Sequence, residues 1–130
     1  MTEKRQIATT EAPLPVGPYS QAIEARGIIL TSGQMGINPS TARLAEGIEN
    51  QTRQALRNVE TILRTAHSTL DNAIKVTVFL KDITSFARMN EIYAEYFPKN
   101  PPARSCVEVN NLLDGAEVEI EVMATVDENG

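Results

Sequence analysis

The residues with the clearest potential for chemistry lie in the last third of the chain: one arginine, one cysteine and a run of glutamates. Arg104 and Cys106 alternate along one strand-like segment, and Glu117, Glu119 and Glu121 alternate along the next. A guanidinium group is a planar fork that binds both oxygens of a carboxylate and so orients a ligand. A glutamate on the same face could then act on a water molecule or on a proton of the ligand.

A second interpretation of the same residues involves no chemistry. Arg104 would pair across the sheet with Glu108, Glu119 or Glu121, and glutamates at every second position usually mark a solvated strand face. Residue types and spacing alone favour this structural interpretation.

The single cysteine and the single histidine give weaker signals. Cys106 has no second cysteine with which to form a disulfide within the chain, and its neighbour Arg104 leaves only a small case for a reactive thiol against a packing role. His67 lies near the end of a predicted helix, where a cation compensates the helix dipole. No Cys/His set has metal-ligand spacing and no glycine-rich phosphate motif occurs, so we expect no metal and no cofactor.

Length and charge limit the fold and the partners. The chain has 130 residues, 42% of them hydrophobic, which predicts one domain over residues 1–130 with a core of its own. A net charge of −5 argues against a nucleic-acid partner, because phosphate binding needs clustered cations. The N-terminal residues lack the apolar core of a signal peptide and no apolar run is long enough for a bilayer, so we expect a cytoplasmic protein without a membrane partner.

Hydrophobic periodicity predicts the elements that must position these residues. Apolar residues at spacings of three and four predict a helix over residues 49–66, and Thr84 is a candidate N-cap for a second helix that ends before Pro98. The buried stripe of that second helix would comprise Phe86, Met89, Tyr93 and Phe97. Alternating segments predict strands over residues 28–32, 74–80, 103–109 and 117–126, with one or two more strands before them. This order predicts an α/β (α+β) domain, a sheet with both helices on one face.

The sheet face away from the helices has a mixed composition. Strand alternation places Glu119 and Glu121 there, and we expect Phe79, Cys106 and Met123 beside them. A face that is half apolar and half ionic is better suited to another subunit than to water. We therefore expect a homo-oligomer.

Six short motifs follow one another along nearly the whole chain, from about Ile7 to Ala124. They are GPYSQ (17–21), TSGQ (31–34), VFLKD (78–82), MNEIY (89–93), PARSCVEV (102–109) and VEIE (118–121). Together they resemble the RidA (YjgF) family of reactive-intermediate deaminases. The resemblance implies a chorismate-mutase-like fold with a mixed sheet, in which another strand lies between the last two.

The same resemblance implies an assembly and an activity. The assembly is a homotrimer with its sites in clefts between subunits. The activity is hydrolysis of 2-imino acids such as 2-iminobutanoate and 2-iminopropanoate, or of their enamine tautomers, to 2-oxo acids and ammonia. Pyridoxal-phosphate-dependent dehydratases release such intermediates, and their removal needs no cofactor.

The resemblance also implies roles for individual residues. Arg104 would hold the substrate carboxylate, and Glu119 would activate or position the attacking water. Cys106 would then be a wall of the site and not a nucleophile. The substrate-binding set comprises Tyr19, Ser32, Gly33, Asn90, Arg104 and Cys106.

Two other functions compete with this hypothesis. A non-catalytic module could bind small 2-oxo acids or amino acids, or shield other proteins, but such a module needs Arg104 and not Glu119. An endoribonuclease is the third candidate, and the net charge of −5 argues against it.

Overall fold

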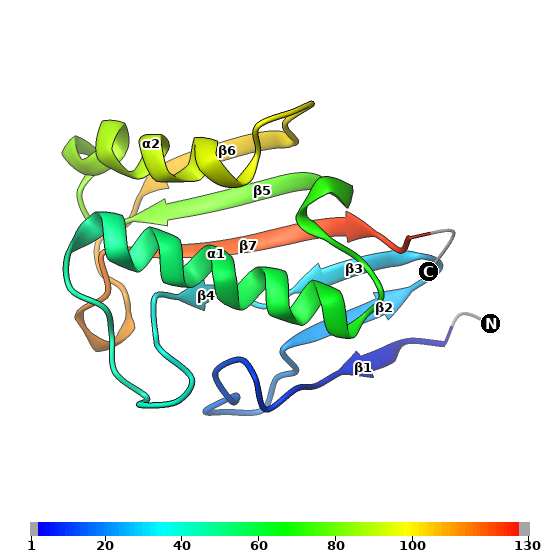
Figure 1. The fold of residues 1–130 in the computed structure, drawn as a ribbon. Coiled ribbons are helices and arrows are strands. Elements are labelled where there is room, and N and C mark those ends of the chain that lie inside the picture. Colours follow the sequence, from blue (N-terminus) through cyan, green and yellow to red (C-terminus); the bar gives the residue numbers. More distant parts are fainter. Residues whose placement is uncertain (1–2, 128–130) are drawn as a thin grey trace.

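Residues 3–127 of a computed structural model are described, and they form one mixed sheet with two α-helices (Figure 1). The helices are α1 (Gly47–Thr65) and α2 (Phe86–Tyr96). The strands are β1 (Arg5–Ile7), β2 (Ala22–Ala25), β3 (Ile28–Thr31), β4 (Gln34–Met35), β5 (Ala73–Leu80), β6 (Ala103–Glu108) and β7 (Val118–Thr125). The sheet order is β1-β2-β3-β7-β5-β6, and β4 pairs with β7 beyond the end of β3.

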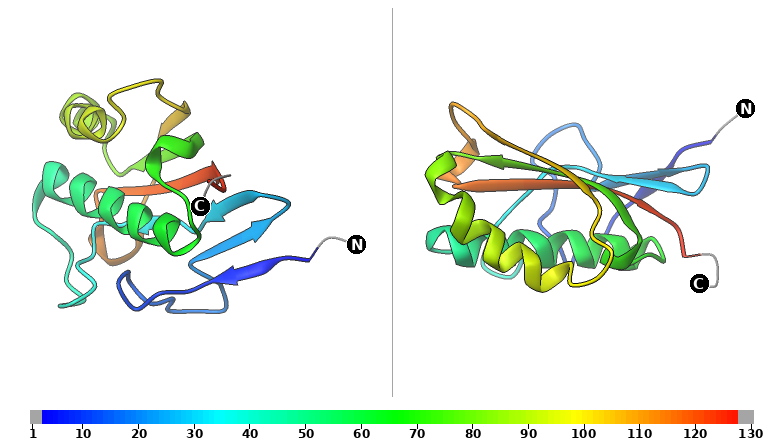
Figure 2. Two further views of the ribbon diagram at one scale, coloured as in Figure 1. Left: turned by 45° about the vertical axis from the view of Figure 1, so that its right-hand side comes forward. Right: turned by 90° about the horizontal axis from the view of Figure 1, so that it is seen from above.

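Both helices cover the same face of the sheet, as the sequence predicts (Figure 2). The α1 positions spaced by three and four are all buried, including Ala55, Val59 and Ile62. They pack against the alternate residues of β7 that are also buried, among them Val118 and Ile120. Within residues 3–127, no helix is long and apolar enough to cross a membrane.

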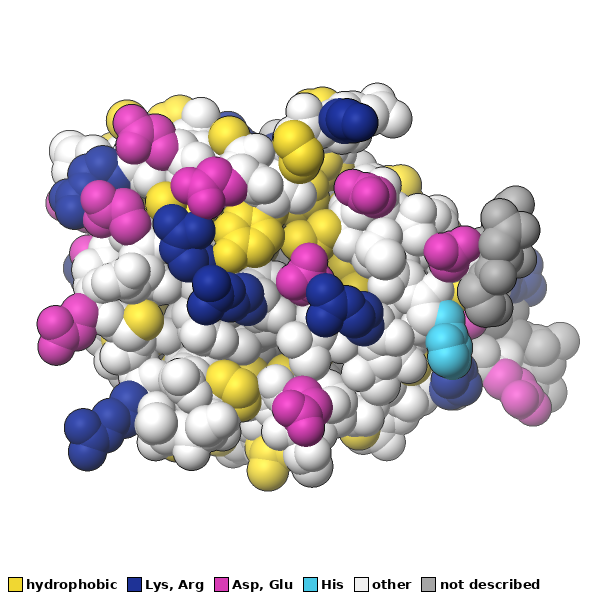
Figure 3. Space-filling model, viewed as in Figure 1, with side chains coloured by type: hydrophobic (Ala, Val, Ile, Leu, Met, Phe, Trp, Pro, Cys, Tyr) yellow, Lys and Arg dark blue, Asp and Glu magenta, His cyan; other side chains and the backbone are white. Residues whose placement is uncertain are grey.

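The outer surface of the helical layer is charged (Figure 3). Arg53 of α1 pairs with Glu95 of α2 at 2.9 Å, and Arg88 of α2 pairs with Glu49 of α1 at 2.8 Å. Exposed pairs of this kind contribute little to stability, because water screens the two charges. The outer face of α1 and α2 is therefore a solvated surface.

The start of α2 differs from the prediction. A 3₁₀ turn (Ile83–Ser85) precedes the helix, and the Asp82 carboxylate caps that turn by accepting a hydrogen bond from the Thr84 backbone N–H at 2.9 Å. Thr84 is therefore not the N-cap. Phe86, predicted on the buried stripe, is 37% exposed because it lies at the rim of the core beside Arg104.

The last two strands do not form a hairpin, because β5 lies between β6 and β7. This arrangement confirms what the family resemblance implied. It also makes β6 an edge strand, parallel to β5.

The predicted faces of β6 are wrong. In the parallel register Arg104 lies beside Val76 and Cys106 beside Val78, and the two valines are buried under the helices. Paired residues of neighbouring strands share a face, so Arg104 and Cys106 lie on the helix side of the sheet. Alternation within β6 is correct, but only the pairing with β5 decides which alternate set faces the helices.

The glutamates of β7 divide in a way that the sequence did not predict. Glu119 pairs with Phe79 and Glu121 with Thr77, on the open face as expected. Glu117 precedes the strand, and its carboxylate lies 3.4 Å from the amide nitrogen of Gln51 on α1. The expected grouping of Glu117 with the other two is therefore wrong, and neither Glu119 nor Glu121 shares a face with Arg104.

The strand beside β7 is interrupted by one extra residue. Leu30 of β3 pairs with Met123 and Gln34 of β4 pairs with Ile120, so one side advances four residues and the other three. The Val122 backbone N–H at this point donates to the Thr31 hydroxyl oxygen at 3.0 Å. Such a bulge re-aims side chains and exposes backbone, and bulges are common beside active sites.

Candidate active site

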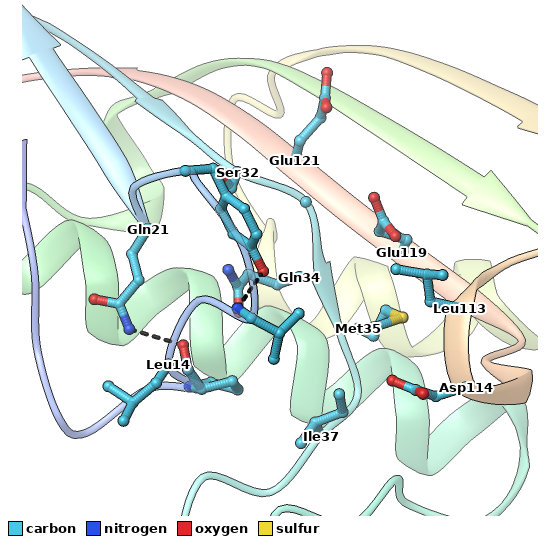
Figure 4. Close-up of a pocket in the computed structure, with 14 residues that line it drawn as sticks. Leu14, Gln21, Ser32, Gln34, Met35, Ile37, Leu113, Asp114, Glu119 and Glu121 are labelled. Atoms are coloured by element: carbon cyan, nitrogen blue, oxygen red, sulfur yellow. Dashed lines mark hydrogen bonds between the residues drawn. The ribbon is translucent and has the colours of Figure 1, made fainter.

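A cavity of about 450 Å³ lies beside the β3–β4 interruption (Figure 4). Four predicted site residues line it: Tyr19, Ser32, Gly33 and Glu119. Its other walls come from the segment before Tyr19, from β4, and from the 3₁₀ turn (Leu113–Gly115) before β7. The remaining predicted residues, which are Asn90, Arg104 and Cys106, do not line this cavity.

Glu119 is the group best placed for proton transfer. Its side chain is half-buried on the cavity wall, and among residues 3–127 no hydrogen bond or ion pair engages its carboxylate. Burial raises the pKa of Glu119, and the negative charge of Glu121 raises it further. A carboxyl group with a raised pKa holds its proton more readily, so it can act as an acid as well as a base.

Gly33 leaves the space that the Glu119 side chain occupies. A Cβ atom on Gly33 would lie 2.1 Å from Glu119 Oε2 and 2.9 Å from Glu119 Cγ. A glycine is therefore required at the bulge for Glu119 to hold this position. Gly36, three residues later, has a different role, since a Cβ there would lie 2.5 Å from the backbone of Gln51 on α1.

These two glycines give a matched pair of variants. Gly33→Ala is expected to leave the melting temperature nearly unchanged, because a flexible carboxylate can move away, and to lower turnover about tenfold or more by displacing Glu119. Gly36→Ala is expected to destabilise the fold by about 1–3 kcal/mol, because rigid backbone must shift. Thermal unfolding and a turnover assay of both variants check this. Equal losses of stability in the two would contradict the assigned role of Gly33.

Two hydroxyl groups line the same cavity as Glu119 and differ in the hydrogen bonds that they can offer a ligand. The Ser32 hydroxyl donates to the Ser20 backbone oxygen at 2.6 Å, so it can only accept from a ligand. The Tyr19 hydroxyl accepts from the Val16 backbone N–H at 3.3 Å, which leaves its proton free to donate. Ser32 therefore offers the cavity an acceptor and Tyr19 offers it a donor, beside the Glu119 carboxyl group.

Arg104 lies on the other face of the sheet, in a setting suited to a carboxylate ligand. Its guanidinium carbon lies 4.6 Å from the centre of the Tyr93 ring and 5.4 Å from that of Phe86, and one nitrogen donates to Asn90 Oδ1 at 2.6 Å. No carboxylate of the described chain forms an ion pair with it. The aromatic rings and Asn90 hold the plane of the guanidinium in place and leave most of its N–H groups unused.

This geometry excludes the structural interpretation of Arg104. Glu119 and Glu121 lie on the opposite face, and the Glu108 carboxylate accepts a hydrogen bond from the Ile83 backbone N–H at 2.8 Å. None of the three glutamates that could have paired with Arg104 does so.

Cys106 follows Arg104 on the same face and packs against the hydrophobic core. Burial raises the pKa of its thiol, and the nearby Arg104 opposes this with a smaller effect. A protonated thiol is a poor nucleophile, which agrees with a wall and not with a nucleophile. In the part of the chain that is described, no three His, Cys, Asp or Glu side chains are placed to hold a metal ion.

The predicted residues thus form two separate groups in one chain. The cavity group of Tyr19, Ser32, Gly33 and Glu119 lies around the bulge, and the arginine group of Asn90, Arg104 and Cys106 lies along β6 and α2. Sequence reasoning did not single out Gln21, which also lines the cavity. The available signal was its place at the end of the GPYSQ motif, two residues after Tyr19.

Comparisons with known proteins show the family of the chain. The family model described as Endoribonuclease L-PSP matches residues 9–126. A RutC family protein of Pyrococcus horikoshii is 49% identical over 122 residues, covering 93% of this chain and 97% of its own. The human 2-iminobutanoate/2-iminopropanoate deaminase is 43% identical over 122 residues, covering 93% and 89%. The crystal structure of Escherichia coli TdcF with bound serine is 35% identical, with a TM-score of 0.91 over 95% of this chain and 99% of that one.

Proposed function

Because the chain belongs to the RidA (YjgF, endoribonuclease L-PSP) family, we propose that it hydrolyses 2-imino acids to 2-oxo acids and ammonia. Proposed substrates are 2-iminobutanoate, 2-iminopropanoate and their enamine tautomers. Relatives from human and mouse that are 43% and 42% identical bear the name of this activity. The proposed setting is the cytoplasm, where the protein would remove reactive intermediates.

The observation that carries the proposal is the state of Glu119. A pure binding module for small carboxylates has no use for a half-buried carboxylate with a raised pKa in its cavity. Holding such a group costs stability, so its presence indicates proton transfer. The bulge and Gly33 lie where they leave room for the Glu119 side chain.

A second copy of the chain is needed to complete the proposed site. Arg104 and Glu119 lie on opposite faces of one sheet, so the two side chains of a single copy cannot both contact one small molecule. We propose a homotrimer in which the arginine group of one subunit meets the cavity of its neighbour. A cyclic, head-to-tail interface joins two different surfaces in this way.

Each proposed step has a group to perform it. The Arg104 guanidinium binds the substrate carboxylate through two parallel hydrogen bonds. Ionised Glu119 takes a proton from water as the water oxygen attacks C2 of the protonated imine, and the C=N double bond becomes a single bond in a neutral carbinolamine. Glu119 then returns the proton to nitrogen, and ammonia leaves with the C–N bonding pair. As the 2-oxo group forms, Glu119 takes the proton of the C2 hydroxyl and passes it to the ammonia, which leaves as ammonium.

The enamine tautomer needs one step before this sequence. Its C3 must be protonated, and neutral Glu119 can supply that proton before it acts as a base on water. The Tyr19 hydroxyl can donate a hydrogen bond to the reacting nitrogen or oxygen, because its own oxygen already accepts one from Val16 N–H. The proposed reaction consumes one water and releases one ammonia, with no change of oxidation state.

The test is release of 2-oxobutanoate from 2-iminobutanoate that a threonine dehydratase generates in the cuvette. We expect the protein to accelerate release above the uncatalysed rate with the dehydratase held constant. Absence of acceleration by a folded oligomer, together with binding of 2-oxobutanoate by calorimetry, would favour the non-catalytic binding module. The E. coli relative TdcF was solved with bound serine, so a small α-amino acid is the second ligand to test.

The pH dependence follows from the environment of Glu119. Water activation requires the carboxylate, so activity is expected to fall as the pH drops through a Glu119 pKa that lies above the ordinary glutamate value. Glu121→Gln removes a negative charge that raises this pKa, so its acid limb is expected at lower pH than that of the wild type. A kcat/KM profile from pH 4 to 8 checks the direction. An acid limb at the same pH in Glu121→Gln and in the wild type would contradict the effect of Glu121 on the Glu119 pKa.

A further inference from the structure

Gln21 has a buried side chain whose hydrogen-bonding capacity is fully directed at one segment of backbone. It is 2% exposed. Its amide oxygen accepts from the Thr9 N–H at 2.7 Å, and its amide nitrogen donates to the oxygens of Thr9 at 3.0 Å and Pro13 at 2.8 Å. A buried amide that holds both ends of a five-residue segment fixes the shape of that segment.

The segment that Gln21 holds has little packing behind it. Pro13 and Leu14 face the 450 Å³ cavity, whereas Thr9 and Leu14 also line a second hollow of about 250 Å³. Ala12 is buried, but Leu14 is 65% exposed. A cavity wall with open space on both sides depends on its hydrogen bonds for its position.

The same wall continues to Tyr19. Val16, three residues after Pro13, donates its backbone N–H to the Tyr19 hydroxyl oxygen at 3.3 Å. Figure 4 shows the first link, from Gln21 to the segment that carries Leu14. A shift of the segment would therefore also shift the Val16 N–H, which keeps the Tyr19 hydroxyl proton directed into the cavity.

We propose that Gln21 is a positioning residue for Tyr19: through the Thr9–Pro13 backbone it holds Val16 N–H against the Tyr19 hydroxyl, so that this hydroxyl donates into the cavity. The inference rests on the proposed deaminase function. Gln21 itself does not touch the reacting atoms, and its effect on turnover passes through Tyr19.

A double-mutant cycle tests this route. Gln21→Met keeps the volume of the side chain and removes its hydrogen bonds, and Tyr19→Phe removes only the hydroxyl. We expect Gln21→Met to lower kcat/KM about tenfold in the wild type but less than about twofold in the Tyr19→Phe background, because coupled residues are not additive. The loss of melting temperature from Gln21→Met is expected to be the same in both backgrounds.

Ser68→Ala is the control for loss of a buried hydrogen bond away from the cavity. Its hydroxyl donates to the Thr125 backbone oxygen at 2.6 Å, so the variant is expected to lose stability but keep its kinetics. Equal kinetic losses from Gln21→Met in both backgrounds, or no loss in either, would overturn the inference while leaving the deaminase intact. A wild type without turnover would instead contradict the proposed function. In that case calorimetry measures the affinity for 2-oxobutanoate of the wild type, Gln21→Met, Tyr19→Phe and the double variant. Additive losses of affinity would then overturn the proposed coupling between Gln21 and Tyr19.

Discussion

Replacing Glu119 by Gln is expected to lower kcat for 2-iminobutanoate hydrolysis by about 10²- to 10³-fold, the usual contribution of a general acid–base group. The amide has nearly the shape of the carboxylate but cannot take a proton from water. Gln also fits the space beside Gly33, so the cavity should stay intact. Steady-state kinetics at neutral pH measure the loss.

The stability of the same variant is expected to change in the opposite direction. The pKa of Glu119 is raised in the folded chain, so the folded state binds this proton more tightly than the unfolded state does. Its stabilising contribution is therefore complete below the unfolded pKa, about 4.3, and is lost as the pH rises through the folded pKa. At pH 7, Glu119→Gln should unfold at the same temperature as the wild type or higher.

Glu117→Gln is the matched control, because Glu117 lies outside the cavity near α1. It is expected to keep its turnover. Loss of both activity and stability in Glu119→Gln would indicate a structural carboxylate and would contradict the assigned proton shuttle.

Replacing Arg104 by Ala is expected to lower kcat/KM about 10²-fold, mainly through KM, because a charged hydrogen-bonding pair with the substrate is lost. Arg104→Lys should recover only part of this. Lysine keeps the charge but not the planar fork, and it stacks less well between Phe86 and Tyr93. Inhibition by 2-oxobutanoate provides a second measure of carboxylate binding.

Arg88→Ala is the control for loss of an arginine from the same region. Its side chain is 61% exposed and pairs with Glu49 on the helical surface. We expect kinetics close to those of the wild type. An Arg104→Ala variant that binds 2-oxobutanoate as tightly as the wild type would exclude Arg104 as the carboxylate anchor.

The sequence predicted those features of the fold that depend on local periodicity. The stripe of α1 and the alternation of β5, β6 and β7 each arise within one segment, and all appear within one or two residues of the expected bounds. The faces of Arg104 and Cys106 depend instead on pairing with β5, which is 28 residues away in the chain for the pair Val76 and Arg104. No local pattern contains that information.

The residues of the candidate site were predicted from the family motifs, whereas their division into two groups was not. Tyr19, Ser32, Gly33 and Glu119 meet around a one-residue bulge that only the register of β7 reveals. The raised pKa of Glu119 depends on burial and on Glu121, and the burial arises only in the folded chain. Gln21 belongs to the GPYSQ motif, but its hydrogen bonds to the Thr9–Pro13 backbone cannot be predicted from local sequence.

The measurement that tests the central claim most directly is complementation between two inactive variants. Arg104→Ala and Glu119→Gln chains, carrying different tags, are co-expressed and the mixed assemblies are purified through both tags. In a cyclic trimer that contains both kinds of chain, about a third of the sites have an intact Arg104 from one copy and an intact Glu119 from the next. We predict ammonia release at roughly that fraction of the wild-type rate, far above either variant alone. Mixed assemblies no more active than the separate variants would contradict a site shared between two copies of the chain.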